Sequence, residues 1–446
     1  MGLTGIAAAP LPAHRDRWEQ RLLADPALLG ELARIVGGPF HVLFPERVVH
    51  AVHEFRAAFE AAGVTGAIYY GKKANKAACV ARACARAGAG IDVASTGELV
   101  GALAQGVRGG ELVVTGPAKA DELLWLAARH GALIAVDALD ELDRLPAATD
   151  GAPPPRILLR ALPAGSTSRF GLTEPELDEA HARLDRLAGR VRWEGLSFHL
   201  SGYDAEQRAE FAHELLDRLA GAVASGHPAR TLSIGGGFGV DYVPAAAWAE
   251  FTAAAGPHWF HGGAEPGSYY PYHFPVPGAA MLTAILRHRG LAERLIATGT
   301  VLAVEPGRAL LDRAGCTVFR VQGRKTRRSD GEPYDLLTVD GTSLSLSEQW
   351  FDSEYLPDPV VWPARPGVRT PTSVGAATCL DSDLLSRRRV PLPRRAEPGD
   401  LLVYPNTAGY QMDSNESAFH DLPVPPKIVL TEHAGALRWR LDSAPT

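Results

Sequence analysis

Two lysines follow a short apolar run near residue 70, at a position where an amine could do chemistry. The run at residues 66–70, with the sequence GAIYY, predicts a buried strand, and Lys72 and Lys73 come directly after it. A lysine there is either a solvated charge at the strand end or an amine held at a reactive site. The spacing from Tyr70 and to Asn75 selects Lys73, whose amine can form a Schiff base with a carbonyl group. Lys72 is then interpreted as an ordinary rim charge.

Three further polar groups would suit pyridoxal phosphate, a cofactor whose aldehyde forms such a Schiff base. The glycines at 235–237 follow another apolar run, and glycine backbone N–H groups can approach a phosphate closely. Glu305 could pair with the pyridine nitrogen, and His199 could stack on the ring. Each also has an ordinary structural explanation: a turn, a salt bridge from Glu305 to Arg308, and a histidine packed in the core.

Eight short apolar runs alternate with helical stretches between residues 66 and 308. The helical stretches, such as Asp121 to Arg129 and Ala205 to Ala220, have apolar residues at three- and four-residue spacing. One face of each helix is therefore expected to pack against the core, and the opposite face to be exposed to solvent. Eight such units in about 250 residues predict a closed (β/α)8 TIM barrel, the alternative being a doubly wound open sheet. The predicted strands are 66–70, 91–94, 111–115, 133–137, 156–161, 195–200, 231–235 and 301–305.

The polar groups gather at one end of this predicted barrel. They come just past the strands, and barrel active sites lie at the carboxyl ends of the strands. Chance would not readily collect a lysine, a histidine, a glycine triplet and a Glu-Arg pair there. The residues at these strand ends are Lys73, Asp92, Thr115, Asp137, Arg160, His199, Gly235, Gly236, Gly237, Glu305 and Arg308.

The pattern changes after about residue 309, where segments alternate or run apolar between turn residues. We therefore predict a barrel over 46–308 and a mostly β domain over 309–446, completed by an N-terminal segment, 1–45. One stretch, 256–278, is rich in aromatic residues amid Gly and Pro. It either lines the mouth of the active site or packs on itself or on a partner subunit.

The composition places limits on partners and compartment. A net charge of -6 over 446 residues gives no reason to expect nucleic-acid binding, and the basic runs 324–328 and 387–389 are interpreted as solvated loops. The four cysteines lack metal-ligand spacing, so we expect no bound metal ion. We also expect the protein to be located in the reducing cytoplasm. No run of about 18 apolar residues predicts a membrane span, and no N-terminal signal peptide is evident.

The motifs resemble those of the fold type III pyridoxal-phosphate decarboxylases, the family of ornithine, arginine and diaminopimelate decarboxylases with an alanine racemase-like barrel. The resemblance runs from about residue 40 to residue 430 and is to a less-characterised bacterial branch. One such motif alone is weak evidence, whereas seven in family order are specific. They are Tyr70-x-x-Lys73-Ala74-Asn75, the stretch from Gly90 to Leu99, Ser168-Arg169-Phe170-Gly171 with Phe198-His199, Ile234-Gly235-Gly236-Gly237-Phe238, Glu305-Pro306-Gly307-Arg308, Cys379 with Asp383, and Ala408-Gly409-Tyr410.

The resemblance implies a homodimeric enzyme that removes CO₂ from an amino acid. Lys73 would hold pyridoxal phosphate as a Schiff base, Glu305 would keep its ring an electron sink, and His199 would stack on the ring. The carbanion left by CO₂ would be protonated at Cα by Cys379 of the partner subunit. The implied cofactor-binding residues are Lys73, Asp92, Arg160, His199, Gly235, Gly236, Gly237, Glu305, Gly307, Arg308 and Tyr410, and the implied substrate-binding residues are Asp381, Asp383 and Tyr410.

Departures from the family pattern bear on the substrate. An acidic residue that helps bind the distal end of the substrate normally follows the cysteine, but Leu380 stands there and Asp381 comes one position later. After His199 the usual glycine-serine pair appears as Ser201-Gly202, which moves the phosphate-facing hydroxyl by one residue. We therefore expect an unusual amino-acid substrate, from a specialised biosynthetic pathway.

Two other functions stay open for the same cofactor and barrel. An amino-acid racemase or epimerase would use a tyrosine where the decarboxylases use cysteine, and Tyr404 and Tyr410 are candidates. A non-catalytic, pyridoxal-phosphate-binding homologue would serve as a regulator, although such proteins generally lose cofactor residues. Here Lys73, His199 and Glu305 are all present.

Overall fold

A computed structural model of the 446-residue chain describes residues 6–187, 189–346 and 353–442. The chain divides into two compact units. The barrel unit holds residues 48–239 and 276–310, and the sheet unit holds residues up to 47, 240–275 and 311–442. The sequence prediction kept residues 240–275 inside the barrel, whereas they group with the sheet unit.

Eight parallel strands close the barrel, and all eight were predicted. Most of their residues are buried, and β5 (Leu133–Val136) is buried and apolar throughout. The strand order follows the chain, and β9 pairs with β2 to close the ring. The strands are β2 (Gly66–Gly71), β3 (Gly90–Val93), β4 (Leu112–Val114), β5 (Leu133–Val136), β6 (Arg156–Arg160), β7 (Arg192–Ser197), β8 (Thr231–Ser233) and β9 (Val301–Val304).

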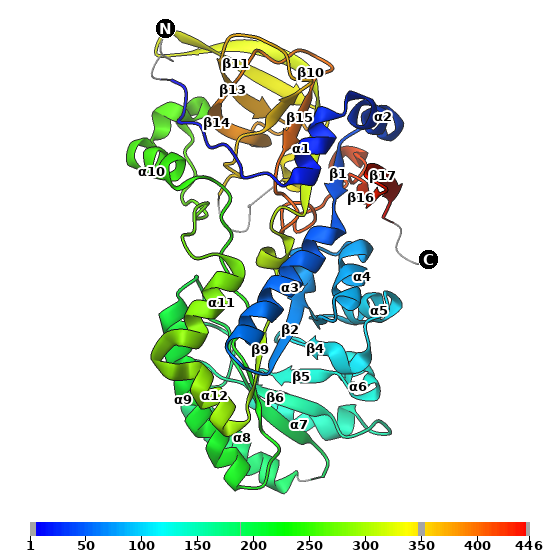
Figure 1. Ribbon diagram of the computed structural model, residues 1–446, viewed down its shortest axis with the longest axis vertical. Helices are drawn as coiled ribbons and strands as arrows, with labels where there is room; N and C mark the ends of the chain where they lie inside the picture. The colour runs from blue at the N-terminus through cyan, green and yellow to red at the C-terminus, as the bar shows by residue number, and fades with distance from the viewer. Residues whose placement is uncertain (1–5, 188, 347–352, 443–446) are drawn as a thin grey trace. The chain divides into compact units, whose positions relative to one another are not determined.

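Helices lie around the outside of the barrel (Figure 1). One of them begins at a capping box, Thr173 with Glu176, and another at the N-cap Ser95, whose hydroxyl accepts from the Glu98 N–H. The helices are α3 (Pro45–Ala61), α4 (Ala78–Arg86), α5 (Thr96–Ala104), α6 (Asp121–His130), α7 (Leu139–Ala148), α8 (Glu174–Arg186), α9 (Ala205–Ala224), α11 (Gly278–Arg287) and α12 (Leu291–Thr298).

The second unit is built on a nine-stranded sheet, as the predicted mostly β domain requires. The N-terminal segment completes it, because β1 pairs with both β10 and β16, and Trp18, Leu22 and Leu29 pack into its core. Its helices are α1 (Arg17–Ala24), α2 (Pro26–Val36) and α10 (Ala245–Ala254). Its strands are β1 (Phe40–Leu43), β10 (Gly315–Ser329), β11 (Glu332–Val339), β12 (Val360–Trp362), β13 (Thr370–Gly375), β14 (Leu384–Leu392), β15 (Leu401–Tyr404), β16 (Lys427–His433) and β17 (Ala436–Leu441).

The aromatic stretch 256–278 packs mainly within the sheet unit. Phe260 forms a β-bridge with Arg388 of β14, and the Arg389 guanidinium donates to the carbonyls of His258 (2.7 Å) and Phe260 (3.0 Å). Tyr272 donates to the Glu354 carbonyl at 3.0 Å. Of the alternatives open at the sequence level, the structure shows an insertion that packs on its own chain.

The interpretation of the basic runs as solvated loops was right about solvent exposure for residues 325–328 but wrong about their structure, and it was wrong about the burial of Arg388 and Arg389. Residues 324–328 lie in strand β10, and Arg388 and Arg389 are buried in β14. The Arg388 guanidinium donates to the carbonyls of Ala9 (2.9 Å) and Leu356 (2.6 Å). Backbone carbonyls thus replace water around these charges, which a charge pattern alone does not reveal.

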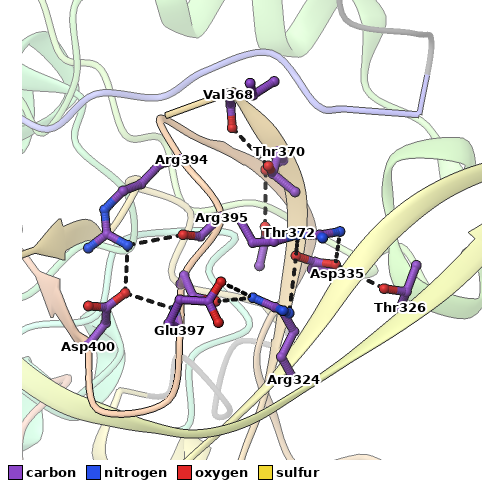
Figure 2. A network of polar contacts seen from close by, with 11 residues as sticks. Arg324, Thr326, Asp335, Val368, Thr370, Thr372, Arg394, Arg395, Glu397 and Asp400 are labelled. Atoms are coloured by element: carbon purple, nitrogen blue, oxygen red, sulfur yellow. Dashed lines mark hydrogen bonds and ion pairs between the residues drawn. The ribbon is translucent and has the colours of Figure 1, made fainter. Parts of the chain in front are cut away.

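Arg324 belongs to a network of polar contacts in the same unit, drawn in Figure 2. It donates to Glu397 (2.6 Å), while the buried Asp400 accepts from Arg394 (2.6 Å) and from the Glu397 backbone N–H (2.8 Å). Asp335 accepts two hydrogen bonds from Arg395. These ion pairs join β10 and β11 to the turn before β15.

Among the helices of residues 6–187, 189–346 and 353–442, none combines the length and the apolar character that a membrane span requires.

Candidate active site

Lys73 lies on a short 3₁₀ turn, Lys72–Ala74, at the carboxyl end of β2. Tyr70 and Asn75 hold this turn: the Tyr70 hydroxyl donates to the Asn75 carbonyl (3.0 Å), and the Asn75 side chain accepts from the Ala77 N–H (3.0 Å). Lys73 faces a cavity, whereas Lys72 is buried with its side chain beside Gly101. The interpretation of Lys72 as an ordinary rim charge was therefore wrong.

The cavity has a volume of about 310 Å³ and opens at the carboxyl ends of the barrel strands. This size falls in the range of small-molecule sites, about 300–1,000 Å³. Most of the residues predicted at the strand ends come together on its wall. The wall consists of Lys73, Asp92, Ala94, Glu98, Thr115, Gly116, Pro117, Ala135, Arg160, Ser168, Phe170, Ser197, Phe198, His199, Ser201 and Glu305.

Glu305 and Asp92 are two carboxyl groups on this wall. The Ser233 hydroxyl donates to Glu305 at 2.6 Å, and the Thr115 hydroxyl donates to Asp92 at 2.6 Å. Burial raises the pKa of Glu305 to about 7, and the nearby Asp92 adds to the rise. Burial also raises the pKa of Asp92, against the attraction of Lys73. The cavity therefore favours a neutral Glu305 until a positive group lies beside it.

His199 follows β7 and carries no charge at neutral pH. Burial lowers its pKa to about 3, and the positive charges of Lys73, Arg160 and Arg208 lower it further. The Gly236 N–H donates to its Nδ1 at 3.1 Å, which places the ring proton on Nε2. The exposed part of the ring faces the cavity, so a neutral aromatic face is available there.

The glycine triplet follows β8 and packs too tightly for any side chain. A Cβ on Gly235 would lie 2.6 Å from the Phe198 carbonyl oxygen, and one on Gly236 would lie 2.7 Å from that of Glu305. Gly235 and Gly237 also have positive φ angles, 68° and 77°. The Gly235 N–H donates to Ser233 and the Gly236 N–H to His199, so the triplet first of all fixes the site's own side chains.

Arg160 and Phe170 form another part of the wall. Arg160 donates to Asp137 at 3.2 Å, and its guanidinium lies 4.7 Å from the centre of the Phe170 ring. Gly171, with φ of 90°, donates its N–H to the same Asp137 carboxylate at 3.1 Å. The Ser-Arg-Phe-Gly motif thus bends back over β6 and brings Phe170 to the cavity.

The Glu-Pro-Gly-Arg motif closes the seam between β9 and β2. The Gly71 N–H donates to the Pro306 carbonyl at 3.3 Å, and Gly307 approaches Gly71 closely. Arg308 is buried and begins a 3₁₀ turn, Arg308–Leu311. Gly307 and Arg308 therefore support the cavity wall without lining it.

The predicted residues of the second domain lie in the sheet unit. Cys379 and Asp381 are exposed on the loop between β13 and β14, and Tyr410 has a positive φ of 75°. The Asp383 carboxylate accepts from the Ser343 N–H (2.8 Å) and the Thr378 hydroxyl (2.6 Å). Asp383 thus holds the loop that carries Cys379.

One group in the described part of the chain could hold a metal ion, although none was predicted. Ligand atoms of His181, Asp185 and His227 lie within 4.8 Å of one another, next to the ring of Trp193. His227 and Asp185 already form a hydrogen-bonded pair at 2.9 Å. His227 of this group comes just before β8, at the amino end of the barrel strands. The cavity lies at their carboxyl ends, so the group is remote from it.

Comparisons with known proteins place the chain among amino-acid decarboxylases. Residues 46–259 match the model described as "Pyridoxal-dependent decarboxylase, pyridoxal binding domain". The chain is 38% identical over 436 residues to y4yA, an uncharacterised protein of Sinorhizobium fredii, covering 95% of this chain and 94% of that protein. It is 30% identical to the diaminopimelate decarboxylase of Actinosynnema pretiosum subsp. auranticum, covering 95% and 92%.

The chain belongs to the pyridoxal-dependent decarboxylases. Its fold is similar to that of the lysine/ornithine decarboxylase of Vibrio vulnificus solved with putrescine, at a TM-score of 0.72 and 21% identity, covering 94% of this chain and 99% of that one. The predicted family, barrel fold and pyridoxal phosphate cofactor are confirmed.

The cavity of this decarboxylase fits pyridoxal phosphate. An acidic group, a neutral aromatic ring and an amine all face one space of suitable size. The Ser197 hydroxyl is buried at the wall and has no hydrogen-bond partner within the described residues, so it is ready for a polar ligand. The pKa of Glu305 is raised to about 7, and the positive charge of a protonated pyridine beside it would favour the ionised carboxylate.

Sequence reasoning missed Ser197 and Ser233. Each is the last residue of its strand, β7 and β8. A hydroxyl at the carboxyl end of a barrel strand is the signal that could have found them.

Proposed function

We propose that this decarboxylase removes the α-carboxyl group of an amino acid, with pyridoxal phosphate held at the barrel cavity by Lys73. The observation that carries the proposal is the placement of Lys73, His199 and Glu305 on the wall of one cavity of about 310 Å³. The chemistry of these groups matches the three needs of the cofactor: an amine, a ring face and an acid.

Each residue has a distinct task towards the cofactor. The Lys73 amine would bind its aldehyde carbon, and the neutral His199 ring would offer an aromatic face to it. Glu305 would accept a hydrogen bond from the protonated pyridine nitrogen, with Ser233 fixing the carboxylate by a 2.6 Å hydrogen bond. The Gly237 N–H and the hydroxyls of Ser197 and Ser201 would be donors for the phosphate. When bound, pyridoxal phosphate accepts the electron pair that departing CO₂ leaves on the α-carbon.

The sheet unit supplies the proton donor in this proposal. Cys379 of the partner subunit in a homodimer gives its thiol proton to the α-carbon. In the same proposal Asp381 would bind the substrate, and Tyr410 would bind the substrate and the phosphate. Asp383 acts on the substrate through the loop that it holds.

The proposed substrate is an unusual amino acid. Some relatives are diaminopimelate decarboxylases, and in the family pattern described above the acid after the cysteine helps bind the distal end of the substrate. Here Leu380 occupies that position and is exposed, and the nearby Asp383 and Glu354 carboxylates each already accept two hydrogen bonds from their own chain. A distal ammonium would therefore find Asp381 as its one carboxylate on this loop.

A racemase that uses Tyr404 is less well supported, because Tyr404 is fully buried and its hydroxyl lies 3.0 Å from the Ser386 hydroxyl in the sheet core. A reaction on the α-carbon would need an exposed hydroxyl.

The experiment is to measure CO₂ release and α-proton exchange for a panel of amino acids with the purified holoenzyme. We expect CO₂ and amine in equal amounts for at least one substrate. We also expect the near-visible absorbance of the bound cofactor to vanish in Lys73→Ala and to persist in a control, Lys76→Ala. Exchange of the α-proton without CO₂ would contradict the proposal.

A further inference from the structure

Cys379 lies in contact with a histidine from a distant part of the chain. Its Sγ is 3.3 Å from Nε2 of His420, within hydrogen-bonding distance for sulfur. Both side chains are exposed. The thiol comes from the β13–β14 loop and the imidazole from a 3₁₀ turn, Phe419–Asp421. A thiol beside an imidazole is a pair that exchanges a proton readily.

The backbone on both sides holds this contact in place. On the cysteine side, the Asp383 carboxylate bonds Ser343 and Thr378 and so fixes the loop. On the histidine side, His420 and its neighbour Asp421 have φ angles of 62° and 57°, in the left-handed region that non-glycine residues rarely adopt. Such strain persists where the surrounding structure imposes it, and it collects at functional sites.

Ring packing also orients the imidazole. The Phe419 ring centre lies 4.4 Å from that of His420, and Phe419 lines the cavity of about 430 Å³ in the sheet unit that Thr378 and Leu380 also line. His420 is thus fixed by a strained backbone, an aromatic neighbour and a thiol.

We propose that His420 is a positioning residue, which orients the Cys379 thiol and returns its proton after each turnover. This inference rests on the proposed function, in which the Cys379 S–H bond breaks and the proton joins the α-carbon. The thiolate left behind takes a proton from Nε2 of the protonated His420 imidazolium, which leaves a neutral imidazole. The exposed imidazole regains a proton from water, so the pair ends each cycle unchanged.

The first test measures how fast iodoacetamide alkylates Cys379 in the holoenzyme, with the site identified by mass spectrometry. The other three cysteines, at 79, 84 and 316, are buried, so the reagent reports on Cys379. Since the thiolate is the reacting form, His420→Ala should slow alkylation by about tenfold. His433→Ala, another exposed histidine of the sheet unit, should leave the rate as in the wild type. A rate within twofold of wild type in His420→Ala would overturn the inference.

The second test is a double-mutant cycle on turnover. Cys379→Ala should lower kcat by about 10²-fold and His420→Ala by about tenfold, since a positioned acid contributes roughly 10²–10⁴. If His420 acts through Cys379, the double variant is no slower than Cys379→Ala alone. If the fold-losses in kcat of the two single variants multiplied in the double variant, His420 would act independently of Cys379, and the inference would be overturned.

The same variants separate this inference from the proposed function. Full turnover of Cys379→Ala would show that Cys379 is not the donor, which removes the proposed function's acid whatever His420 does. Reduced turnover of Cys379→Ala with unchanged alkylation in His420→Ala would remove the inference alone.

Discussion

Glu305 and His199 have pKa values shifted in opposite directions by the same cause. Burial disfavours the charged form of each, so the pKa of Glu305 rises to about 7 and that of His199 falls to about 3. Burial thus favours the neutral forms of both side chains on the cavity wall that they share with Lys73. A protonated pyridine beside Glu305 would reverse the first shift, which links cofactor binding to the charge on this one carboxyl group.

Glu305 should give the cofactor-free protein a pH-dependent stability. Because its pKa in the folded state, about 7, exceeds the ordinary 4.5, the folded state holds an extra proton between these values. Its contribution is fully present below pH 4.5 and is lost as the pH rises towards 7, by up to about 3 kcal/mol. Glu305→Gln removes this loss, so the free energy of unfolding of the variant should gain on the wild type between pH 5 and 7.

Urea unfolding of the cofactor-free proteins at several pH values measures this difference. Glu60→Gln, at an exposed position of α3, should follow the wild-type profile. If the free energy of unfolding of wild type and of Glu305→Gln changed in parallel with pH, Glu305 would be ionised throughout this range, which would contradict the prediction.

At the scale of elements, the βα loops position the site. The loop after β8 passes so close to Glu305 and His199 that its glycines carry hydrogen bonds to the site's side chains. Strand ends give the residues their places, and the loops fix their orientation.

Gly236→Ala should therefore impair cofactor binding. Its Cβ would meet the Glu305 carbonyl oxygen at 2.7 Å, so the backbone that holds Glu305 must move. We expect the dissociation constant of pyridoxal phosphate to rise by about tenfold or more, as for misplaced site groups. Gly110→Ala, whose Cβ meets no atom within 4 Å, is the matched control. Equal affinities in a fluorescence titration would contradict this role of the loop.

The network of Figure 2 allows a matched test of the sheet unit's stability. Asp400→Ala leaves the buried Arg394 guanidinium without its carboxylate, at a cost of about 3 kcal/mol. Glu397→Ala breaks the more exposed pair with Arg324 and should cost no more than about 1 kcal/mol. Thermal unfolding of both variants measures the contrast, and equal losses would contradict it.

Local patterns predicted the strands and the strand-end residues, because period and position along a strand are properties of neighbouring residues. The bond from Ser233 to Glu305 joins residues 72 apart and has no local signature. The burial of Lys72 beside Gly101 likewise depends on how a strand and a helix meet. Residues 240–275 lie between two barrel strands in the sequence, and composition does not tell which core they join.

At the scale of the whole molecule, the residues of the proposed site come from two units. The barrel unit carries Lys73 and Glu305, and the sheet unit carries Cys379 and His420. We propose that each site combines the barrel of one copy with the sheet unit of the other. Neither unit alone then holds a complete set of catalytic groups.

The central claim is that one site uses Lys73 from one subunit and Cys379 from its partner. Lys73→Ala and Cys379→Ala should each release little or no CO₂. After dissociation, mixing in equal amounts and reassociation, half of the dimers are mixed and each has one intact site, so CO₂ release should return to about a quarter of the wild-type rate. A mixture no more active than the two variants apart would contradict the claim.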